Sequence, residues 1–567
     1  MTHLRLCHWV LALTLPLTIA LSACATPASP GTSSSSTQPQ QPAAPKRVTA
    51  AIMGNPVSPV DRFIGGRSGG GVPGIAEFAK MVGSGLVVGR DLDSAFVPQL
   101  AEAVPSFENG LWKIAADGTM ETTWKIRPGA RWHDGTPVSS ADFVFTTKLE
   151  QDKELPVVID PAYEVIASVT APDAQTVTVN WKSPYITADQ FFSLPPVPRH
   201  ILEEPYQANK DSFVSLPYWN TSFVGAGPFR VAQWVQDQHA VLEAFDGFVL
   251  GRPKIDTIVV KFLPDESAFM GNILAGEVDV TVGKSITYEQ AAEIKTQWSS
   301  GRVETSPQTV VKMWPQFLEP KPAVMLNTQY RKALFHAINR QELVESLVPG
   351  GVSSVANSVL LPIEPLFKEG ETTAVTYEYD PRKAADMIQQ LGYTRGADGM
   401  FRDASGEILT TQIQATNEAQ NTKPSFAVAD YWKRVGVAGE VDVVPIQLQN
   451  DRRYRAAFPG VALQGSTSGI QRIGELLSSQ ARTAENNFTG RNYPRYMNPD
   501  FDVLIKNLFS TIPQAQRTQA LQTVIQHMTD QVVMYSLFYA VTPSMISNRM
   551  VNAGFYPTWN TYEWDVK

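Results

Sequence analysis

Short strand-like segments alternate with amphipathic helical segments from residue 47 to the end of the chain. Two segments, Thr122–Ile126 and Thr176–Trp181, alternate between apolar and polar side chains as half-buried strands do. Ile255–Leu263 is almost continuously apolar, which is typical of a buried strand, and Arg47–Met53 is expected to form the first strand. Mixed strands and helices over this length predict α/β or α+β lobes.

Three helices are predicted, two of them from clear start signals. Ser139–Asp142 has capping-box spacing ahead of an apolar run. Asp380 is followed by Pro381 and, after a helical pattern, by Gly392, so it is expected to cap a helix that ends at that glycine. Tyr330–Leu347 places its apolar side chains on one face and predicts a single helix.

The N-terminus has the organisation of a secretion signal. Arg5 precedes an apolar stretch from Trp9 to Leu21, and small residues lead to Cys24. Leu21-Ser22-Ala23-Cys24 resembles a bacterial lipobox, in which the cysteine is lipidated and becomes the new N-terminus. We therefore expect residues 1–23 to be a lipoprotein signal peptide; the alternative is an ordinary signal with an incidental cysteine.

The cysteine content supports the lipoprotein interpretation. The chain has two cysteines, and Cys7 leaves with the signal, so the mature domain has no disulfide. Residues 24–46 are rich in Ser, Pro, Gln and Thr and are expected to form a disordered tether. This organisation predicts an extracytoplasmic, membrane-anchored protein in the periplasm or on the outer face of the cell membrane.

Composition limits the remaining possibilities. The net charge of −8 leaves no basic surface for nucleic acid, and it weakly disfavours anionic ligands. The longest internal apolar run, Val532–Val541, is shorter than the roughly 18 residues that a membrane span needs. The lipid is therefore the expected membrane anchor, and about 520 residues remain for up to three domains.

Catalytic and metal-binding motifs are sparse. Ser68 fits a nucleophile-elbow pattern and Gly69–Gly74 fits a dinucleotide fingerprint, but both lie in one Gly-rich stretch that Pro73 interrupts, so a loop is the favoured interpretation. The mature chain has five histidines without metal-ligand spacing: His133, His200, His239, His336 and His527. We expect no catalytic residue, no metal and no cofactor.

One long segment carries a family resemblance. Trp124–Phe145 (WKIRPGARWHDGTPVSSADFVF) resembles the signature of the family 5 extracellular solute-binding proteins, the peptide and nickel binding proteins of ATP-binding cassette importers. Gly225–Phe229, Gly276–Asp279, Arg331–Arg340 and Asn498–Asp502 are similar to further family motifs, in the family's order. Asn339 stands where the family usually has Asp.

The resemblance implies a two-lobed α/β periplasmic-binding-protein-like fold of class II with an extra subdomain on lobe I. Carried over, residues 47–305 and 540–567 form lobe I, its inserted subdomain spans about residues 78–218, and residues 306–539 form lobe II. Two hinge crossings are then expected near Thr305–Val311 and Leu537–Thr542. The lobes would close over a ligand.

The same resemblance implies the function. We expect a monomeric, non-enzymatic solute receptor that captures a peptide-like or other organic solute and delivers it to importer permease subunits. Peptide binders of the family pair a lobe II acid with the ligand's amino group, but Phe458–Ser466 lacks that acid. An oligosaccharide or another organic solute therefore remains an alternative ligand, and nickel would require either a pocket with His or an organic chelator.

Two other functions remain as alternatives: a receptor that reports ligand occupancy to a signalling partner, and, more remotely, a lipidated hydrolase that uses Ser68. Segments that face the cleft in this fold supply the expected ligand-binding residues. They are Arg67, Ser68, Trp314, Gln464, Ser466 and Tyr539.

Overall fold

A ten-stranded sheet runs through the fold, and two of its central strands are longer than the rest. The computed structural model describes residues 44–60, 62–63, 72–90, 95–155, 157, 160–283, 285–463, 468–554 and 558–567. Within residues 45–567 the sheet order is β16 (Ala438–Val443), β15 (Thr410–Ala415), β17 (Val461–Leu463), β12 (Gly301–Pro315), β18 (Tyr535–Ser547), β11 (Val280–Thr281), β1 (Arg47–Ile52), β10 (Thr257–Phe262), β9 (His239–Ala244) and β8 (Phe229–Val235).

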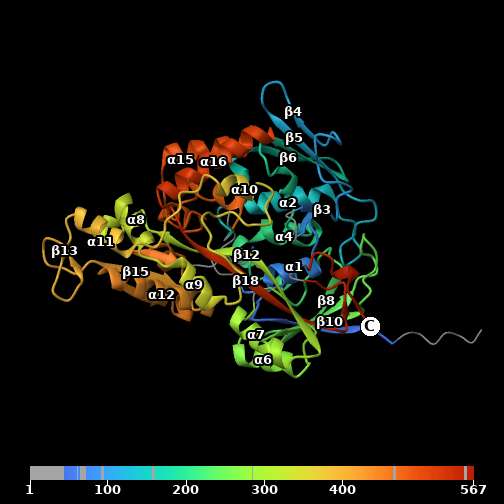
Figure 1. The fold of residues 1–567 in the computed structure, drawn as a ribbon. Helices are drawn as coiled ribbons and strands as arrows, with labels where there is room; N and C mark the ends of the chain where they lie inside the picture. Colours follow the sequence, from blue (N-terminus) through green and yellow to red (C-terminus); the bar gives the residue numbers. More distant parts are fainter. Residues whose placement is uncertain are drawn as a thin grey trace, which may run out of the picture. The chain divides into compact units, whose positions relative to one another are not determined.

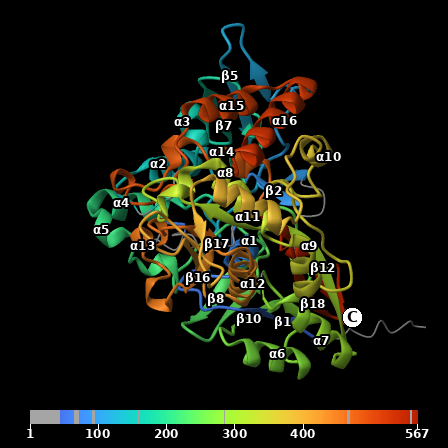
Figure 2. The ribbon, with the colours of Figure 1, turned by 60° about the vertical axis from the view of Figure 1, so that its left-hand side comes forward.

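The two long strands join the two halves of this sheet. β12 and β18 lie side by side and antiparallel, from the pair Gly301–Ser547 to the pair Met313–Tyr535 (Figures 1 and 2). On one side β15 pairs in parallel with β16 and β17, and on the other β1 pairs in parallel with β10 and β11. Every strand beyond β12 and β18 therefore belongs to one half or the other.

A second, four-stranded sheet forms within the first half of the chain. Its order is β4 (Trp112–Ile114), β5 (Met120–Lys125), β7 (Thr176–Trp181) and β6 (Ile166–Asp173). Short pairs complete the described strands: β2 (Val87–Arg90) with β3 (Ala95–Pro98), β13 (Thr394–Arg395) with β14 (Phe401–Arg402), and β19 (Met550–Val551) with β20 (Asp565–Val566). The predicted inserted subdomain, residues 78–218, contains the four-stranded sheet; its boundaries stay a prediction.

Helices cover both halves of the large sheet. In the first part of the chain they are α1 (Ile75–Val82), α2 (Ser140–Gln151), α3 (Ala162–Val165), α4 (Arg199–Ala208), α5 (Lys210–Phe213), α6 (Glu266–Leu274) and α7 (Tyr288–Gln297). In the second part they are α8 (Thr328–His336), α9 (Arg340–Leu347), α10 (Phe367–Glu371), α11 (Pro381–Gln390), α12 (Ala419–Val435), α13 (Arg452–Ala456), α14 (Ile470–Gly474), α15 (Pro499–Ser510) and α16 (Gln514–Asp530).

The two groups of helices pack on different parts of the sheet. α8, α9, α11 and α12 gather around β15, whereas α6 and α7 lie near β1 and β10 (Figures 1 and 2). Among the described residues, no helix is both long and apolar enough to cross a membrane. Each group buries its own apolar cluster, which is what an α/β protein with more than one core requires.

Most of the predicted elements are confirmed. The predicted strands at Arg47–Met53, Thr176–Trp181 and Ile255–Leu263 correspond to β1, β7 and β10. Ser139 and Asp142 form the expected capping box before α2. Asp380 caps α11 by accepting a 2.9 Å hydrogen bond from the Lys383 amide.

The single helix predicted over Tyr330–Leu347 is wrong. The chain forms α8 and α9 instead, separated by residues 337–339. Asn339 caps α9 because its side-chain oxygen accepts a 3.2 Å hydrogen bond from the Glu342 amide. The apolar spacing continues across this break, so periodicity alone does not reveal it.

Trp432 of α12 gives a test of this packing. Its side chain is fully buried, and its indole N–H donates a 3.1 Å hydrogen bond to the Leu334 carbonyl. We expect Trp432→Ala to lower the free energy of unfolding by about 3–5 kcal/mol, because it leaves both a cavity and an unpaired carbonyl. Urea unfolding followed by circular dichroism measures this.

Phe426→Ala on the same helix is the matched control. That side chain is 58% exposed, so its removal should change the free energy of unfolding by no more than about 0.5 kcal/mol. Equal effects of the two substitutions would contradict the assigned core.

Candidate ligand-binding site

The two predicted hinge crossings face each other in the β12–β18 ladder. Thr305 pairs with Pro543, and Val310 pairs with Tyr539. The register shifts between Pro307 and Thr309, which marks an irregularity in the ladder between these pairs. This stretch is where chain segments pass from one half of the large sheet to the other.

A cavity of about 260 Å³ lies beside this ladder, and we call it the hinge cavity. Three segments supply much of its wall: Ser285–Glu289 after β11, Asn417–Gln420 after β15, and Ala540–Thr542 within β18. β11 and β15 each pair in parallel with a neighbour, and the wall segments follow their carboxyl ends. Ligands of open α/β sheets bind at such edges.

The hinge cavity contains polar groups that have no protein partner. Within the described part of the chain, Ser285 Oγ and Thr542 Oγ1 are buried and make no hydrogen bond. α12 also begins at the cavity wall, and its N-cap residue Glu418 makes no capping hydrogen bond with its side chain to a described residue. A bound solute could satisfy these hydroxyl groups and amides.

An ion pair links the two halves across the hinge cavity. Lys423 Nζ of α12 lies 2.7 Å from a Glu289 carboxylate oxygen of α7, and both residues line the cavity. The hydrogen bond from Lys423 lowers the pKa of Glu289. Because both side chains are largely exposed, the pair adds little stability.

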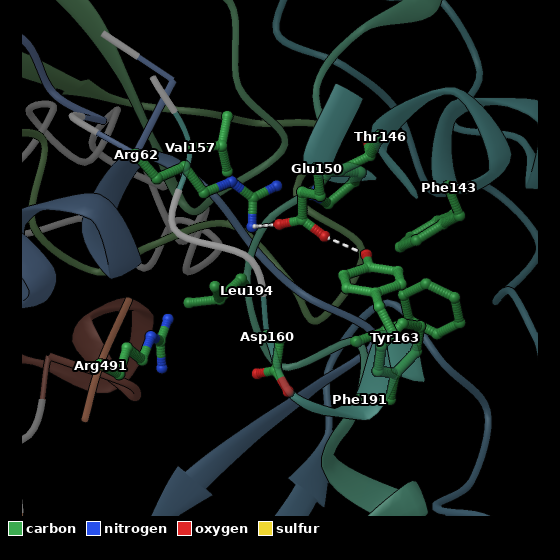
Figure 3. A pocket seen from close by; sticks show the side chains of 12 residues that line it. Arg62, Phe143, Thr146, Glu150, Val157, Asp160, Tyr163, Phe191, Leu194 and Arg491 are labelled. Carbon is green, nitrogen blue, oxygen red and sulfur yellow. Dashed lines mark hydrogen bonds and ion pairs between the residues drawn. The ribbon is translucent and has the colours of Figure 1, made fainter. Parts of the chain in front are cut away.

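A second, smaller pocket of about 50 Å³ contains two arginines, and we call it the arginine pocket (Figure 3). Arg62 Nη1 lies 3.0 Å from Glu150, and the Tyr163 hydroxyl donates a hydrogen bond to the same carboxylate. Asp160 and Arg491 complete the labelled charged groups and come from distant parts of the chain. The pocket thus joins the segment around α3 to the segment before α15.

Next to the arginine pocket, α3 and the residues after β7 contact α15 and the residues before it, and we call this the distal contact. The Ile186 amide donates a 2.8 Å hydrogen bond to the Phe509 carbonyl, and Tyr185 stacks on Phe509 at 5.6 Å. Ser479 Oγ donates a 2.5 Å hydrogen bond to Glu164. In the predicted division these contacts join the inserted subdomain to lobe II.

The structure describes two of the six expected ligand-binding residues, and both are buried. Trp314 stacks near Tyr493, with ring centroids 6.4 Å apart, in an apolar cluster. Tyr539 packs against Val310 and Leu361, and its hydroxyl has no hydrogen-bond partner among the described residues. Burial raises the pKa of Tyr539.

Neither of these two residues is a wall residue of the hinge cavity. Phe538 and Ala540 line the cavity, and neighbouring side chains of a strand point to opposite faces, so Tyr539 points away from it. The other expected residues, Arg67, Ser68, Gln464 and Ser466, lie outside the described residues, as does the lipidation site Cys24. Their roles stay predictions.

The sequence analysis missed a group of buried cations. Lys312 of β12 is fully buried and donates a 3.0 Å hydrogen bond to Ser468 Oγ. Arg455, Arg472 and Arg482 are each at most 3% exposed. A local signal exists, since residues 451–495 hold seven arginines against three carboxylates in a chain of net charge −8.

No metal site is evident in the described ranges, where no three His, Cys, Asp or Glu side chains gather closely enough to hold an ion. His133 is partly buried, and desolvation lowers its pKa to about 4. Its ring accepts a 3.2 Å hydrogen bond from the Gly225 amide and contacts the Gly227 carbonyl at 3.0 Å. These contacts give His133 a packing role.

Solved structures of similar fold define the class of protein. The fold is that of the two-lobed periplasmic binding proteins: the oligopeptide-binding protein of Thermus thermophilus, solved with a pentapeptide, superposes with a TM-score of 0.78 at 21% identity, covering 92% of this chain and 96% of that one. The Thermotoga maritima oligopeptide transporter protein, solved with mannohexaose, gives 0.75 at 18% identity, covering 92% and 99%.

The sequence then gives the family. Residues 95–479 match the model of the bacterial extracellular solute-binding proteins, family 5, and the chain belongs to this family. A Brucella ovis protein whose name assigns it to peptide binding for an ABC transporter is 29% identical over 271 residues. That match spans 47% of this chain and 48% of the relative, so it covers about half the length of each.

Asp189 gives a pH-dependent prediction for the distal contact. It lies in the short helix η1 (Ala188–Gln190), and burial raises its pKa to about 6 from an ordinary value of 3.8. The folded protein therefore binds more protons than the unfolded chain between about pH 4 and 6, and its stability falls as the pH rises through that range.

We expect Asp189→Asn to be more stable than the wild type at pH 7 by about 1–3 kcal/mol, with the difference disappearing below about pH 4. Denaturant titrations at several pH values measure this. Asp211→Asn, at an exposed position, is the control. Its difference in stability from the wild type should not increase between pH 4 and pH 7. A difference for Asp189→Asn that is constant with pH would refute the assignment.

Proposed function

We propose that this protein is an extracytoplasmic solute receptor that binds an organic solute in the hinge cavity and delivers it to an ABC importer. The observation that carries the proposal is the position of the cavity. It lies where parallel strands of both halves of the sheet end, beside the only two strands that connect the halves within the described sheet. Membership of the solute-binding family supports it.

In this proposal, lobe I comprises residues 47–305 and 540–567 and lobe II residues 306–539. A solute in the hinge cavity touches Ser285–Glu289 of one lobe and Asn417–Gln420 of the other. It therefore favours the arrangement in which the lobes are close, since only that arrangement provides both sets of contacts. The Lys423–Glu289 pair and the distal contact belong to this closed arrangement.

The ligand class is proposed from the ligands of similar proteins. Two structural neighbours were solved with a pentapeptide and with mannohexaose. We propose a peptide-like ligand first and an oligosaccharide second. Capture of a free peptide amino group by an acid in Phe458–Ser466 is not part of the proposal, because that segment contains no acid.

A ligand screen on the full-length protein tests the function. Peptides, oligosaccharides and metal chelates are added singly and the melting temperature is recorded. A true ligand at about 1,000 times its Kd adds about 4 kcal/mol of stability, which raises the melting temperature by several degrees. No rise with any member, on folded protein, would count against the proposal.

Ala419→Trp tests whether the solute binds in the hinge cavity. Ala419 lies at the start of α12 and lines the hinge cavity, so an indole there occupies the space of the ligand. We expect the ligand to raise the melting temperature of this variant no longer. Lys433→Trp, at an exposed position near the end of the same helix, should retain the rise. If both variants retain the rise, the solute binds elsewhere.

The lipid anchor is part of the proposal and has its own test. We propose that the lipid on Cys24 and the tether of residues 24–46 hold the receptor near its permease. Cys24→Ala should move the protein from the membrane fraction to the soluble fraction of expressing cells. Cys7→Ala should leave it on the membrane, because Cys7 lies within the signal. Membrane retention of Cys24→Ala would contradict lipidation at this residue.

A further inference from the structure

Four arginine side chains surround one buried tyrosine. The Arg482 guanidinium carbon lies 3.8 Å from the centre of the Tyr493 ring, and that of Arg472 lies 4.8 Å away. Arg455 of α13 and Arg491 are also close enough to affect Tyr493 electrostatically. We call these four arginines and Tyr493 the arginine cluster.

The arginine cluster has more positive than negative charge. Glu475 pairs with both Arg472 and Arg491, the latter at 2.7 Å. Arg482 donates through Nε to the Gly490 carbonyl at 2.7 Å, but its buried Nη1 has no acceptor among the described residues. The buried Nε of Arg472 also has none there. Both side chains are 3% exposed, so water cannot solvate these donors well.

An excess of buried positive charge is costly unless an anion compensates it. Burial works to raise the pKa of the Tyr493 phenol, yet Arg482, Arg472 and Arg455 bring it below its ordinary value. Burial also lowers the pKa of Arg472 to about 10. The site therefore favours a negative charge placed among these side chains.

The cluster borders the arginine pocket and lies near one wall of the hinge cavity. Burial lowers the pKa of Arg455, whereas Tyr493 and Glu418 raise it, so Arg455 lies within electrostatic range of Glu418 in the hinge-cavity wall. Arg491 lines the arginine pocket. Trp314 of the hinge strand β12 stacks near Tyr493. A solute that extends past Glu418 at the edge of the hinge cavity would therefore approach Arg455, the nearest member of the cluster to that wall.

We propose that the arginine cluster is an oxyanion subsite, and that the transported solute carries a carboxylate or phosphate group that binds there. The inference rests on the proposed function and specifies its ligand class. Arg482 supplies an unpaired donor and Arg472 supplies adjacent charge. The guanidinium groups match the planar geometry of such oxyanions. The subsite thus selects anionic solutes although the whole chain is acidic.

Inorganic phosphate and succinate serve as the first probes. The melting temperature of the full-length protein is measured in each, against sodium chloride at equal ionic strength. We expect both oxyanions to raise it relative to chloride. A rise with phosphate alone assigns a phosphate ligand, and a rise with succinate alone assigns a carboxylate. No rise with either, at concentrations below those at which salting-out stabilises proteins in general, would overturn the subsite.

Arg482→Gln separates a binding role from a structural one. If the cluster binds an oxyanion, removing one of the repelling charges should leave the unliganded melting temperature unchanged or raised, while affinity for the probe falls about tenfold or more. Arg434→Gln, an exposed arginine paired with Asp430, is the matched control and should keep the response. Arg482→Lys, which keeps the charge, should give an intermediate affinity.

The outcomes distinguish this inference from the proposed function. If Arg482→Gln only destabilises the protein and binds the probe as the wild type does, the cluster is structural and the inference fails. If a screened acidic solute binds, but its neutral amide binds equally tightly, the receptor function stands and the subsite fails. If phosphate or succinate binds through Arg482 but no screened solute does, the subsite stands and the receptor function fails.

Discussion

The antiparallel ladder between β12 and β18 is the constraint on which the rest of the structure depends. It joins the strands of the two halves, with β17 on one edge and β11 on the other. Because both predicted crossings lie opposite each other in one ladder, a change in its twist would alter the relative orientation of the two halves. The hinge cavity lies beside this ladder, so the geometry that connects the halves also determines the shape of the proposed binding space.

The net charge of the whole chain and the charge buried in its second half have opposite signs. The chain carries a net charge of −8, yet its second half buries Lys312, Arg455, Arg472 and Arg482. Local charge controls recognition because a buried ionic contact is screened far less than one on the surface. Net charge indicates solubility and long-range attraction, whereas the groups that face a ligand determine what it binds.

Much of the fold could be predicted, because the signals are local. Strand alternation located β7, and the Asp380–Pro381 cap located the start of α11. The break between α8 and α9 could not be predicted, because an Asn in a helical pattern acts as a cap only where the tertiary structure turns the chain. The candidate site was harder. Trp314 and Tyr539 were expected from their neighbourhood in the fold, but which face of a strand meets the cavity depends on its partners.

The sequence by itself determined the family, the mixed α/β elements and the presence of a lipobox-like Cys24 ahead of a polar tether, since each of these is written in contiguous residues. The tertiary structure alone decided which distant residues share a site. It placed Ser285, Asn417 and Thr542 around one cavity, and it gathered arginines from separate segments of the chain around Tyr493. Spacing along the chain cannot reveal such groupings, because long-range packing, and not local preference, brings their members together.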